Sequence, residues 1–226
     1  MHNWTPDMTQ ITDLIARDHK ALDSSATIAS AQAFFDDNPY SHFPVLEDGT
    51  YIGCIAAEDA ETFEPEKTIA QYRYTFEAFY ARTNMIWLDL MEVFARNHTN
   101  LIPVLDDDNQ YAGYYEVSDI IAQFSETPFL KELGNVIIVE KGVTDYSIGQ
   151  ITQIVESNNG RILGAFVSEA SNDRIQVTVK IAVGSVNDII QTFRRYDYKI
   201  ISEHREDNYL NNLKERSDYL DRYLNI

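Results

Sequence analysis

The first half of the sequence contains an internal repeat, and this feature limits the fold more strongly than any other. The matched positions keep their order and recur at offsets of 59 or 60: Pro44-Val45-Leu46 with Pro103-Val104-Leu105, Gly53 with Gly113, and Asp59 with Asp119. The extra residue of the second copy falls between these blocks, where a turn tolerates an insertion. Such a repeat indicates two copies of one supersecondary unit that bury their apolar faces against each other.

Each copy predicts a helix, a strand, a hairpin turn, a second strand and a short helix. The strands are short apolar runs, at residues 42–46 and 51–55 in the first copy and at 101–105 and 111–115 in the second. The turns between them, residues 47–50 and 106–109, are acidic, and the first offers Gly49 for a positive φ. The preceding helices should each bury one apolar face. These faces are Ala29, Ala33 and Phe34 in the first copy, and Leu90, Val93 and Phe94 in the second.

The segment between the copies, residues 63–84, is rich in aromatic residues. Four of them lie at helical spacing: Tyr72, Phe76, Phe79 and Tyr80. We favour a helix or an extended linker that packs on the core of its own chain. The other interpretation is a dimerisation surface, and the sequence does not separate the two.

Beyond the repeat, the pattern predicts the order βαββαβ. The strands fall at residues 135–140, 161–169, 174–183 and 198–202, and the helices at 145–158 and 186–196. Asp145 is expected to cap the first helix, and Asn159-Gly160 to end it. The alternating side chains that should face the core from the third strand are Ile175, Val177, Val179 and Ile181. This order is typical of a ferredoxin-like α/β plait, with both helices on one face of an antiparallel sheet.

A last helix is expected at residues 208–224. Its apolar stripe consists of Leu210, Leu213, Leu220 and Leu224, and the remaining positions are largely polar or charged. An amphipathic helix must bury such a stripe, either on its own chain or on a partner.

The net charge of −18 excludes whole classes of function. Binding to nucleic acid or to an anionic membrane surface requires clustered basic residues, and this chain lacks them. The charge is also uneven, because residues 1–134 hold 7 basic and 23 acidic side chains, whereas residues 135–226 hold 11 and 13. This difference favours two domains, residues 1–134 and 135–204, followed by the helix at 205–226. The sequence shows no signal peptide, so we expect a cytoplasmic protein.

The repeat resembles a pair of CBS domains, with copy one at about residues 18–63 and copy two at about 84–124. The resemblance rests on the Pro-Val-Leu block, the turn, the glycine and the closing aspartate, each present twice. The region at residues 135–204 resembles an ACT domain, so the whole chain is similar to the small bacterial CBS–ACT proteins of the acetoin-utilisation type. The resemblance implies an α/β regulatory protein that senses a ligand and is not an enzyme. It also implies a homodimer that rearranges on ligand binding and reports to a regulatory protein partner.

The same resemblance suggests where a ligand would bind. In CBS pairs that take adenosine compounds, the closing aspartate binds the ribose, and Asp59 and Asp119 match it. The hydroxyl residue three positions earlier is replaced here by Ala56 and by Glu116. The residues expected to line the cleft between the copies are His42, Phe43, Pro44, Leu101, Ile102 and Pro103. In the ACT-like region the corresponding loop is Asp145, Tyr146, Ser147 and Ile148, where the glycine comes late, at Gly149.

The charge of Glu116 limits which adenosine compounds we expect to bind. Two like charges about 4 Å apart repel by roughly 4 kcal/mol at an effective dielectric constant near 20. Glu116 would therefore oppose a phosphate, and we expect adenosine or S-adenosylmethionine rather than AMP or ATP. The alternative is an interaction scaffold with empty clefts, in which Asp59 and Asp119 only stabilise helix N-termini.

The sequence offers no clear catalytic or metal-binding motif. The five histidines lack the spacing of a metal pair, and Asp106-Asp107-Asp108 departs from a calcium loop at later positions. The single cysteine, Cys54, lies in a predicted buried strand, so we expect an inert core thiol.

Overall fold

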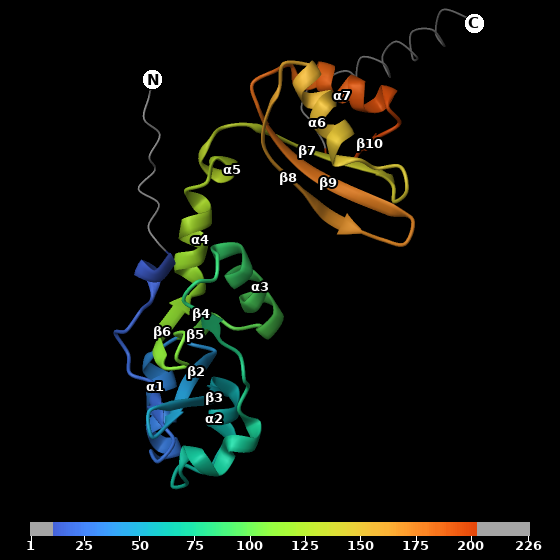
Figure 1. The fold of residues 1–226 in the computed structure, drawn as a ribbon. Coiled ribbons are helices and arrows are strands. Elements are labelled where there is room, and N and C mark those ends of the chain that lie inside the picture. Colours follow the sequence, from blue (N-terminus) through green and yellow to red (C-terminus); the bar gives the residue numbers. More distant parts are fainter. Residues whose placement is uncertain (1–10, 203–226) are drawn as a thin grey trace, which may run out of the picture. The chain divides into compact units, whose positions relative to one another are not determined.

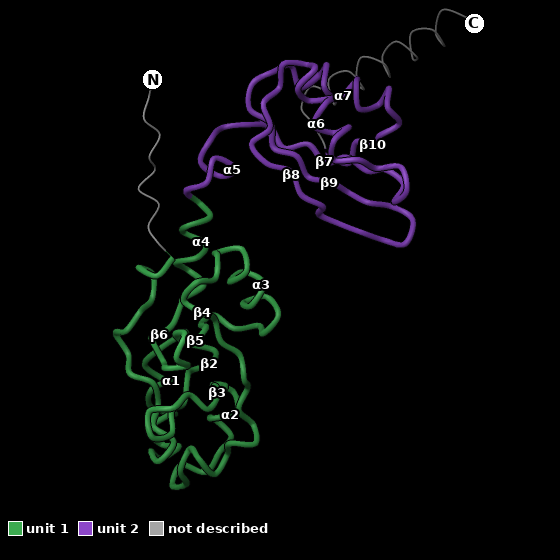
Figure 2. Tube along the Cα trace, viewed as in Figure 1, with its two compact units in different colours: residues 1–125 green, residues 126–226 purple. Residues whose placement is uncertain are grey.

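The computed structural model describes residues 11–202. The chain divides into two compact units, residues 1–125 and residues 126–226 (Figure 2). The helix expected at residues 208–224 lies outside the described residues. Among the residues that are described, no helix is long and apolar enough to cross a membrane.

Unit 1 contains the repeat as two matching three-stranded sheets (Figure 1). The strands are β1 (Leu22–Asp23), β2 (His42–Glu47) and β3 (Thr50–Ala56) in the first copy, and β4 (Ala81–Arg82), β5 (Leu101–Leu105) and β6 (Tyr111–Glu116) in the second. In each sheet the first strand is parallel to the second, which pairs antiparallel with the third. The four strands predicted from the repeat are therefore confirmed.

The first hairpin turn follows from its sequence. Asp48 and Gly49 both adopt positive φ angles, of 49° and 81°. Two left-handed residues in succession match the twist of the flanking strands, which is why such turns favour Asp-Gly. The prediction for this turn is confirmed.

The helices of unit 1 also match the predicted order. They are α1 (Ile28–Asp37), α2 (Ala57–Thr62), α3 (Trp87–Asn97) and α4 (Val117–Ser125), with short 3₁₀ segments η1 (Ile11–Leu14) and η2 (Ile69–Thr75). The buried face of α3 includes Leu90 and Phe94, as expected. The face predicted for α1 is wrong, because Ala29 and Ala33 are exposed. Ile28 and Ala31 are buried instead, and they share one helix face with Phe35, which supplies more apolar surface than an alanine row.

The segment between the copies does not form one helix. The 3₁₀ segment η2 ends before Phe76, which is extended, so the four aromatic residues share no helical face. Tyr72 and Phe79 are buried, and the Tyr72 ring stacks on Phe63 at 3.8 Å. Packing on the chain's own core is confirmed for these two residues, whereas Tyr80 remains 42% exposed.

Each copy is completed by the segment that precedes the other copy. Cys54 of β3 exchanges two backbone hydrogen bonds with Glu77, and Tyr114 of β6 exchanges two with Ala16. Glycine allows the backbone of each of these segments to approach the strand it pairs with. A Cβ atom on Gly53 would lie 2.9 Å from the Phe76 side chain, and one on Gly113 would lie 2.4 Å from the Ala16 carbonyl oxygen.

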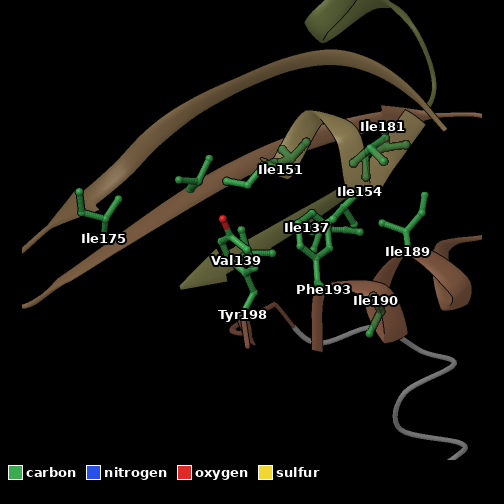
Figure 3. Packing of buried hydrophobic residues seen from close by; sticks show 13 residues of the cluster. Ile137, Val139, Ile151, Ile154, Ile175, Ile181, Ile189, Ile190, Phe193 and Tyr198 are labelled. Carbon is green, nitrogen blue, oxygen red and sulfur yellow. The ribbon is translucent and has the colours of Figure 1, made fainter. Parts of the chain in front are cut away.

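Unit 2 has the predicted order of strands and helices. Its elements are β7 (Asn135–Gly142), α6 (Ile148–Ser157), β8 (Arg161–Ala170), β9 (Arg174–Ala182), α7 (Val186–Arg195) and β10 (Lys199–Ile200). The sheet order is β10-β7-β9-β8 with every neighbour antiparallel, which is the ferredoxin-like plait. Both helices cover one face of the sheet (Figure 1), and their isoleucines meet those of the strands in the core (Figure 3).

The start of α6 differs from the prediction. Its cap is Ser147, whose hydroxyl accepts a hydrogen bond from the Gln150 backbone N–H, and not Asp145. Asp145 lies in the turn after β7, three residues before the helix begins. The predicted end of the helix is confirmed, since Asn159 takes a positive φ of 58°.

The boundary between the units also differs from the one expected after Gly134. A short helix, α5 (Pro128–Lys131), belongs to unit 2. The Phe129 ring lies over Gly164 of β8, where an added Cβ atom would approach it to 2.5 Å. The Lys180 ammonium donates to the Phe129 carbonyl oxygen at 2.5 Å, which ties α5 to the sheet. Charge patterning alone could not reveal this contact.

One buried carboxylate on the sheet of unit 2 is surrounded by donors. Glu140 of β7 accepts hydrogen bonds from Arg174 at 2.9 Å and from Gln176 at 3.1 Å, and Lys199 lies 3.5 Å away. Burial alone would raise the pKa of this carboxyl, but the hydrogen bond from Gln176 and the two cations outweigh burial and lower it.

Candidate functional site

A groove of about 620 Å³ lies between the two copies in unit 1. Its volume falls in the range of about 300–1,000 Å³ that is typical of small-molecule sites. Both copies and the segment between them contribute to its walls. The lining residues are Ser41, His42, Ala57, Glu58, Glu61, Glu77, Asn97 and His98.

His42 is the best-fixed side chain of this groove. It is 8% exposed, and its Nε2 atom lies 3.1 Å from Glu77 Oε1, while its Nδ1 atom lies 3.0 Å from Ser41 Oγ. An ionised carboxylate only accepts hydrogen bonds, so Nε2 carries the proton toward Glu77. The Ser41 hydroxyl has one proton, and His42 Nδ1, Thr99 Oγ1 and Asn100 Oδ1 all lie within hydrogen-bond distance of it. The edge of the His42 ring also contacts Phe79, at 5.6 Å between centroids.

Ser41 links the groove to the joint between the copies. Its backbone N–H donates to Asn100 Oδ1 at 2.9 Å, and the Asn100 backbone N–H donates to Ser41 Oγ at 3.2 Å. The Asn100 side chain also donates to the Pro39 carbonyl oxygen at 2.7 Å. A ligand that contacts Ser41 or His42 therefore contacts the bonds that hold the two copies in register.

The groove is acidic. Among the described residues, its lining includes Glu58, Glu61 and Glu77 and no lysine or arginine. A smaller hollow of about 320 Å³ shares Asn97 with it and contains Arg96, but that guanidinium pairs with Glu92. The charge of the groove thus favours a cationic or uncharged ligand over an anion.

The cleft related to the groove by the repeat is closed by aromatic side chains. Phe43 and Tyr114 are fully buried there, and Phe34 and Tyr40 pack against them. The Tyr40 hydroxyl donates to Glu116 Oε1 at 2.9 Å and lies 3.2 Å from the Tyr114 hydroxyl.

Polar contacts extend this closed cleft to the start of the described chain. The Tyr114 hydroxyl donates to Asp18 Oδ1 at 2.5 Å, and this bond lowers the pKa of Asp18. Burial raises the pKa of Tyr40 to about 12. Burial, together with the nearby Glu116 charge, raises the pKa of Asp119.

Residue size explains the difference between the two clefts. At three pairs of related positions the groove side carries the smaller side chain: Thr99 against Tyr40, Ala56 against Glu116, and Cys54 against Tyr114. The register of the strands is the same in both copies, since His42 pairs with Ala56 and Leu101 pairs with Glu116. The backbone is therefore repeated, and the side chains decide which cleft is open.

No protein-family model and no curated protein matches the chain. Solved structures match about half of it. Among these structures are the CBS domains of several proteins. One, the CBS domains of a transcriptional regulator from Streptococcus pneumoniae, shares 18% identity at a TM-score of 0.46 and covers 51% of this chain and 99% of its own. A CBS domain pair/ACT domain protein from Thermotoga maritima shares 14% identity at a TM-score of 0.47. It covers 52% of this chain and 98% of its own. The CBS domain of a bacterial CNNM/CorC family Mg²⁺ transporter, in complex with ATP, shares 20% identity at a TM-score of 0.43. It covers 51% of this chain and 86% of its own.

Of the cleft residues expected from the sequence, His42 lies in the groove lining. The rest of that expected set is buried: Phe43, Pro44, Leu101, Ile102 and Pro103. Ala56 is also buried and occupies the cap position of α2 without a side-chain hydrogen bond. Glu116 faces Tyr40 in the closed cleft.

The two closing aspartates lie at comparable places. Asp59 and Asp119 sit in the first turns of α2 and α4, where a carboxylate complements the helix dipole. Both are half-buried. In the part of the chain that the structure describes, the Asp59 carboxylate accepts no hydrogen bond, and it is Glu58 and Glu61 of the same helix that line the groove.

Sequence reasoning missed most of the groove. Glu77 comes from the segment between the copies, and Asn97 and His98 come from the end of α3. His98 takes a positive φ of 49° as the helix ends. One sequence signal was available for the acidic wall, because Glu58 and Glu61 of the first copy correspond to Ser118 and Ile121 of the second.

Two residues of the loop expected to bind a ligand in unit 2 stabilise the fold of that unit. Ser147 caps α6, and Tyr146 packs against the core of the unit. Asp145 is exposed, and Ile148 is 41% exposed. The described residues contain no cluster of three or more metal-ligating side chains, in this loop or elsewhere.

Cys54 lies inside unit 1 as expected. Its thiol is fully buried, and burial raises the pKa of the thiol to about 12. The Tyr51 hydroxyl lies 3.4 Å from the sulfur. A protonated, enclosed thiol is a poor nucleophile.

Proposed function

We propose that unit 1 is a regulatory CBS pair that binds one small molecule in the His42 groove and changes the contact between its two copies. One observation carries this proposal. The groove has the volume of a ligand site, and its walls come from both copies and from the segment that joins them. A molecule bound there would contact Glu77, His42 and the Ser41–Asn100 joint at once.

We propose an adenosine compound without excess negative charge as the ligand, with adenosine or S-adenosylmethionine ahead of AMP and ATP. Three glutamates line the groove: Glu58, Glu61 and Glu77. At about 4 Å, each such carboxylate would oppose a phosphate by roughly 4 kcal/mol at an effective dielectric constant of 20. The same carboxylates would attract the positively charged sulfonium group of S-adenosylmethionine.

The remaining parts of the proposal concern the assembly. We propose that unit 2 is an ACT-like module, that the chain forms a cytoplasmic homodimer, and that a regulatory protein partner receives the signal, as in the small bacterial CBS–ACT proteins. The open edge of the unit 2 sheet supports self-association, because β8 exposes Phe166 by 50% and Val167 by 43%. A ten-residue edge strand with exposed apolar side chains is a template for pairing with another chain.

We also propose that the protein is not an enzyme. Ser41, His42 and Glu77 form a hydrogen-bonded row, which invites comparison with a nucleophile–base pair. However, the Ser41 hydroxyl already interacts with Thr99 and Asn100. A hydroxyl held by these partners serves the joint between the copies.

A thermal-shift panel tests the ligand. It contains adenosine, S-adenosylmethionine, AMP, ATP with and without Mg²⁺, and the amino acids. A ligand at about 100 times its Kd should stabilise the chain by about 2.7 kcal/mol. We expect shifts with adenosine or S-adenosylmethionine that Glu77→Gln weakens. The matched control is Glu64→Gln, an exposed glutamate that pairs with Lys67 outside the groove. A shift with AMP alone would show that the charge argument is wrong.

The second candidate function is a scaffold that binds partners without a ligand. It is favoured by the aromatic side chains that pack together in the related cleft, among the residues that the structure describes. If no compound of the panel shifts the melting temperature, the scaffold becomes the better explanation.

A further inference from the structure

The ring of Tyr40 lies in an aromatic cage. It is nearly parallel to the Phe34 ring, at 6.1 Å and 16°, and stacks on Phe43 at 5.3 Å and 30°. Two further rings meet it edge-on, those of Tyr114 at 5.8 Å and His19 at 6.0 Å. Four ring contacts of these two geometries are the arrangement that a bound aromatic molecule would seek.

The hydroxyl of Tyr40 is held at the end of this cage. It donates to Glu116, which also accepts from Ser118 at 3.3 Å, and it lies beside the Tyr114 hydroxyl. Ring stacking and a charge-assisted hydrogen bond together fix both the plane and the direction of the phenol. Tyr40 is thus bound by side chains of both copies.

The repeat shows that the backbone does not require a tyrosine here. Thr99 occupies the related position in the second copy, and its hydroxyl donates to the Leu101 carbonyl oxygen at 2.7 Å. The same strand geometry follows both residues. A small residue at this position is therefore compatible with the fold, and the tyrosine fills space that the threonine leaves.

We propose that the closed cleft is a binding site for a planar, uncharged ring that carries a hydrogen-bond donor, and that the chain's own Tyr40 occupies it. Tyr40 acts as an internal ligand that stabilises the pair on this side, while the His42 groove stays open to a small molecule. This inference goes beyond the proposed function, because it concerns the cleft in which no ligand is proposed.

Chemical rescue tests this proposal without any assumption about the natural ligand. Tyr40→Ala removes the ring, and Tyr40→Thr reproduces the residue of the related position. We expect both variants to melt at lower temperature than the wild type and to be restored by phenol, by roughly 5 °C at ten times its Kd. Benzene, which lacks the hydroxyl for Glu116, should restore less.

Two controls define the result. Tyr40→Phe keeps the ring, so it should gain nothing from phenol. Tyr80→Ala removes a ring that is 42% exposed and lies outside the cage, so phenol should not affect it either. If Tyr40→Ala does not fold alone, recovery of folded protein in the presence of phenol supports the proposal equally.

The outcomes separate this inference from the proposed function. If phenol neither stabilises nor refolds Tyr40→Ala or Tyr40→Thr, the inference is overturned. The space left by the ring would then have collapsed and would not bind a ring from solution. Failure of adenosine compounds to bind the wild type would overturn the proposed function and would leave the phenol result valid. Where adenosine does bind, calorimetry should give one site per chain for the wild type, and two for the wild type would also overturn the inference.

Discussion

Replacing Gly113 by alanine should destabilise unit 1 far more than replacing Gly49 by alanine. Gly113 has a φ of 135°, and a Cβ atom there would lie 2.4 Å from the Ala16 carbonyl oxygen and 2.6 Å from a side-chain carbon of Ile15. Gly49 also has a positive φ, of 81°, but a Cβ atom there would meet nothing within 4 Å. The two substitutions share the backbone penalty and differ in the collision.

The magnitudes follow from these contacts. A non-glycine residue in an unfavourable backbone region costs about 1–3 kcal/mol. Forcing a methyl group into a packed region costs a further ~1–3 kcal/mol. The oxygen that Gly113→Ala would displace accepts the Tyr114 backbone N–H at 3.1 Å, so the collision also endangers a hydrogen bond. We expect a loss of about 2–6 kcal/mol for Gly113→Ala and about 1–3 kcal/mol for Gly49→Ala.

Urea denaturation monitored by tryptophan fluorescence measures the difference. Trp87 belongs to unit 1, and the sequence from residue 126 on contains no tryptophan, so a change in the Trp87 signal reports unit 1. Trp87 stacks on Phe124 at 5.2 Å, a contact that unfolding would break. If the two variants lose the same free energy of unfolding within about 0.5 kcal/mol, the segment around Ala16 is not held against β6 as described.

Three further predictions concern other parts of the chain. Ser147→Ala should lower the stability of unit 2 by about 0.5–2 kcal/mol through loss of the α6 cap, whereas Asp145→Ala should have a much smaller effect; calorimetric melting of the two variants compares them. Cys54 should resist a thiol reagent in the native protein at neutral pH and react once urea unfolds unit 1, and rapid native labelling would contradict its burial. Because the folded-state pKa of Glu140 is lowered, its contribution to stability is present above its unfolded pKa and is lost as pH falls through the folded pKa. Glu140→Gln should therefore flatten the acid limb of the stability–pH curve of unit 2, and an unchanged slope would argue against the donor cluster.

Local pattern was sufficient for most of the fold. The strand runs and the Asp-Gly turn depend on neighbours a few residues away, and the repeat is visible because its motif recurs at a nearly constant offset. The errors occurred where two local solutions were nearly equal. Asp145 and Ser147 are both good capping residues, and the choice depends on where the chain leaves β7. The face of α1 was misassigned because alanine gives little hydrophobic contrast.

The candidate site was harder to predict because it depends on contacts between distant segments. His42 could be assigned to the cleft because it begins a motif strand. Glu77 belongs to a segment whose path is set by tertiary packing, and no spacing rule connects it to His42. Similarly, the replacement of a hydroxyl residue by Glu116 suggested repulsion of a ligand, whereas the structure gives this carboxylate an internal partner, Tyr40.

The segments around Ala16 and Glu77, which each complete the sheet of the other copy, imply an order in which unit 1 folds. The pairing of Cys54 with Glu77 closes a loop of 23 residues (54 to 77), whereas that of Ala16 with Tyr114 closes one of 98 residues (16 to 114). In the unfolded chain the longer closure costs about 1.3 kcal/mol more, and it must wait until the second copy has been synthesised. The pairing of Ala16 with Tyr114 is therefore the contact that closes last. Until it closes, the outer edge of β6 remains unprotected and open to pairing with another nascent chain.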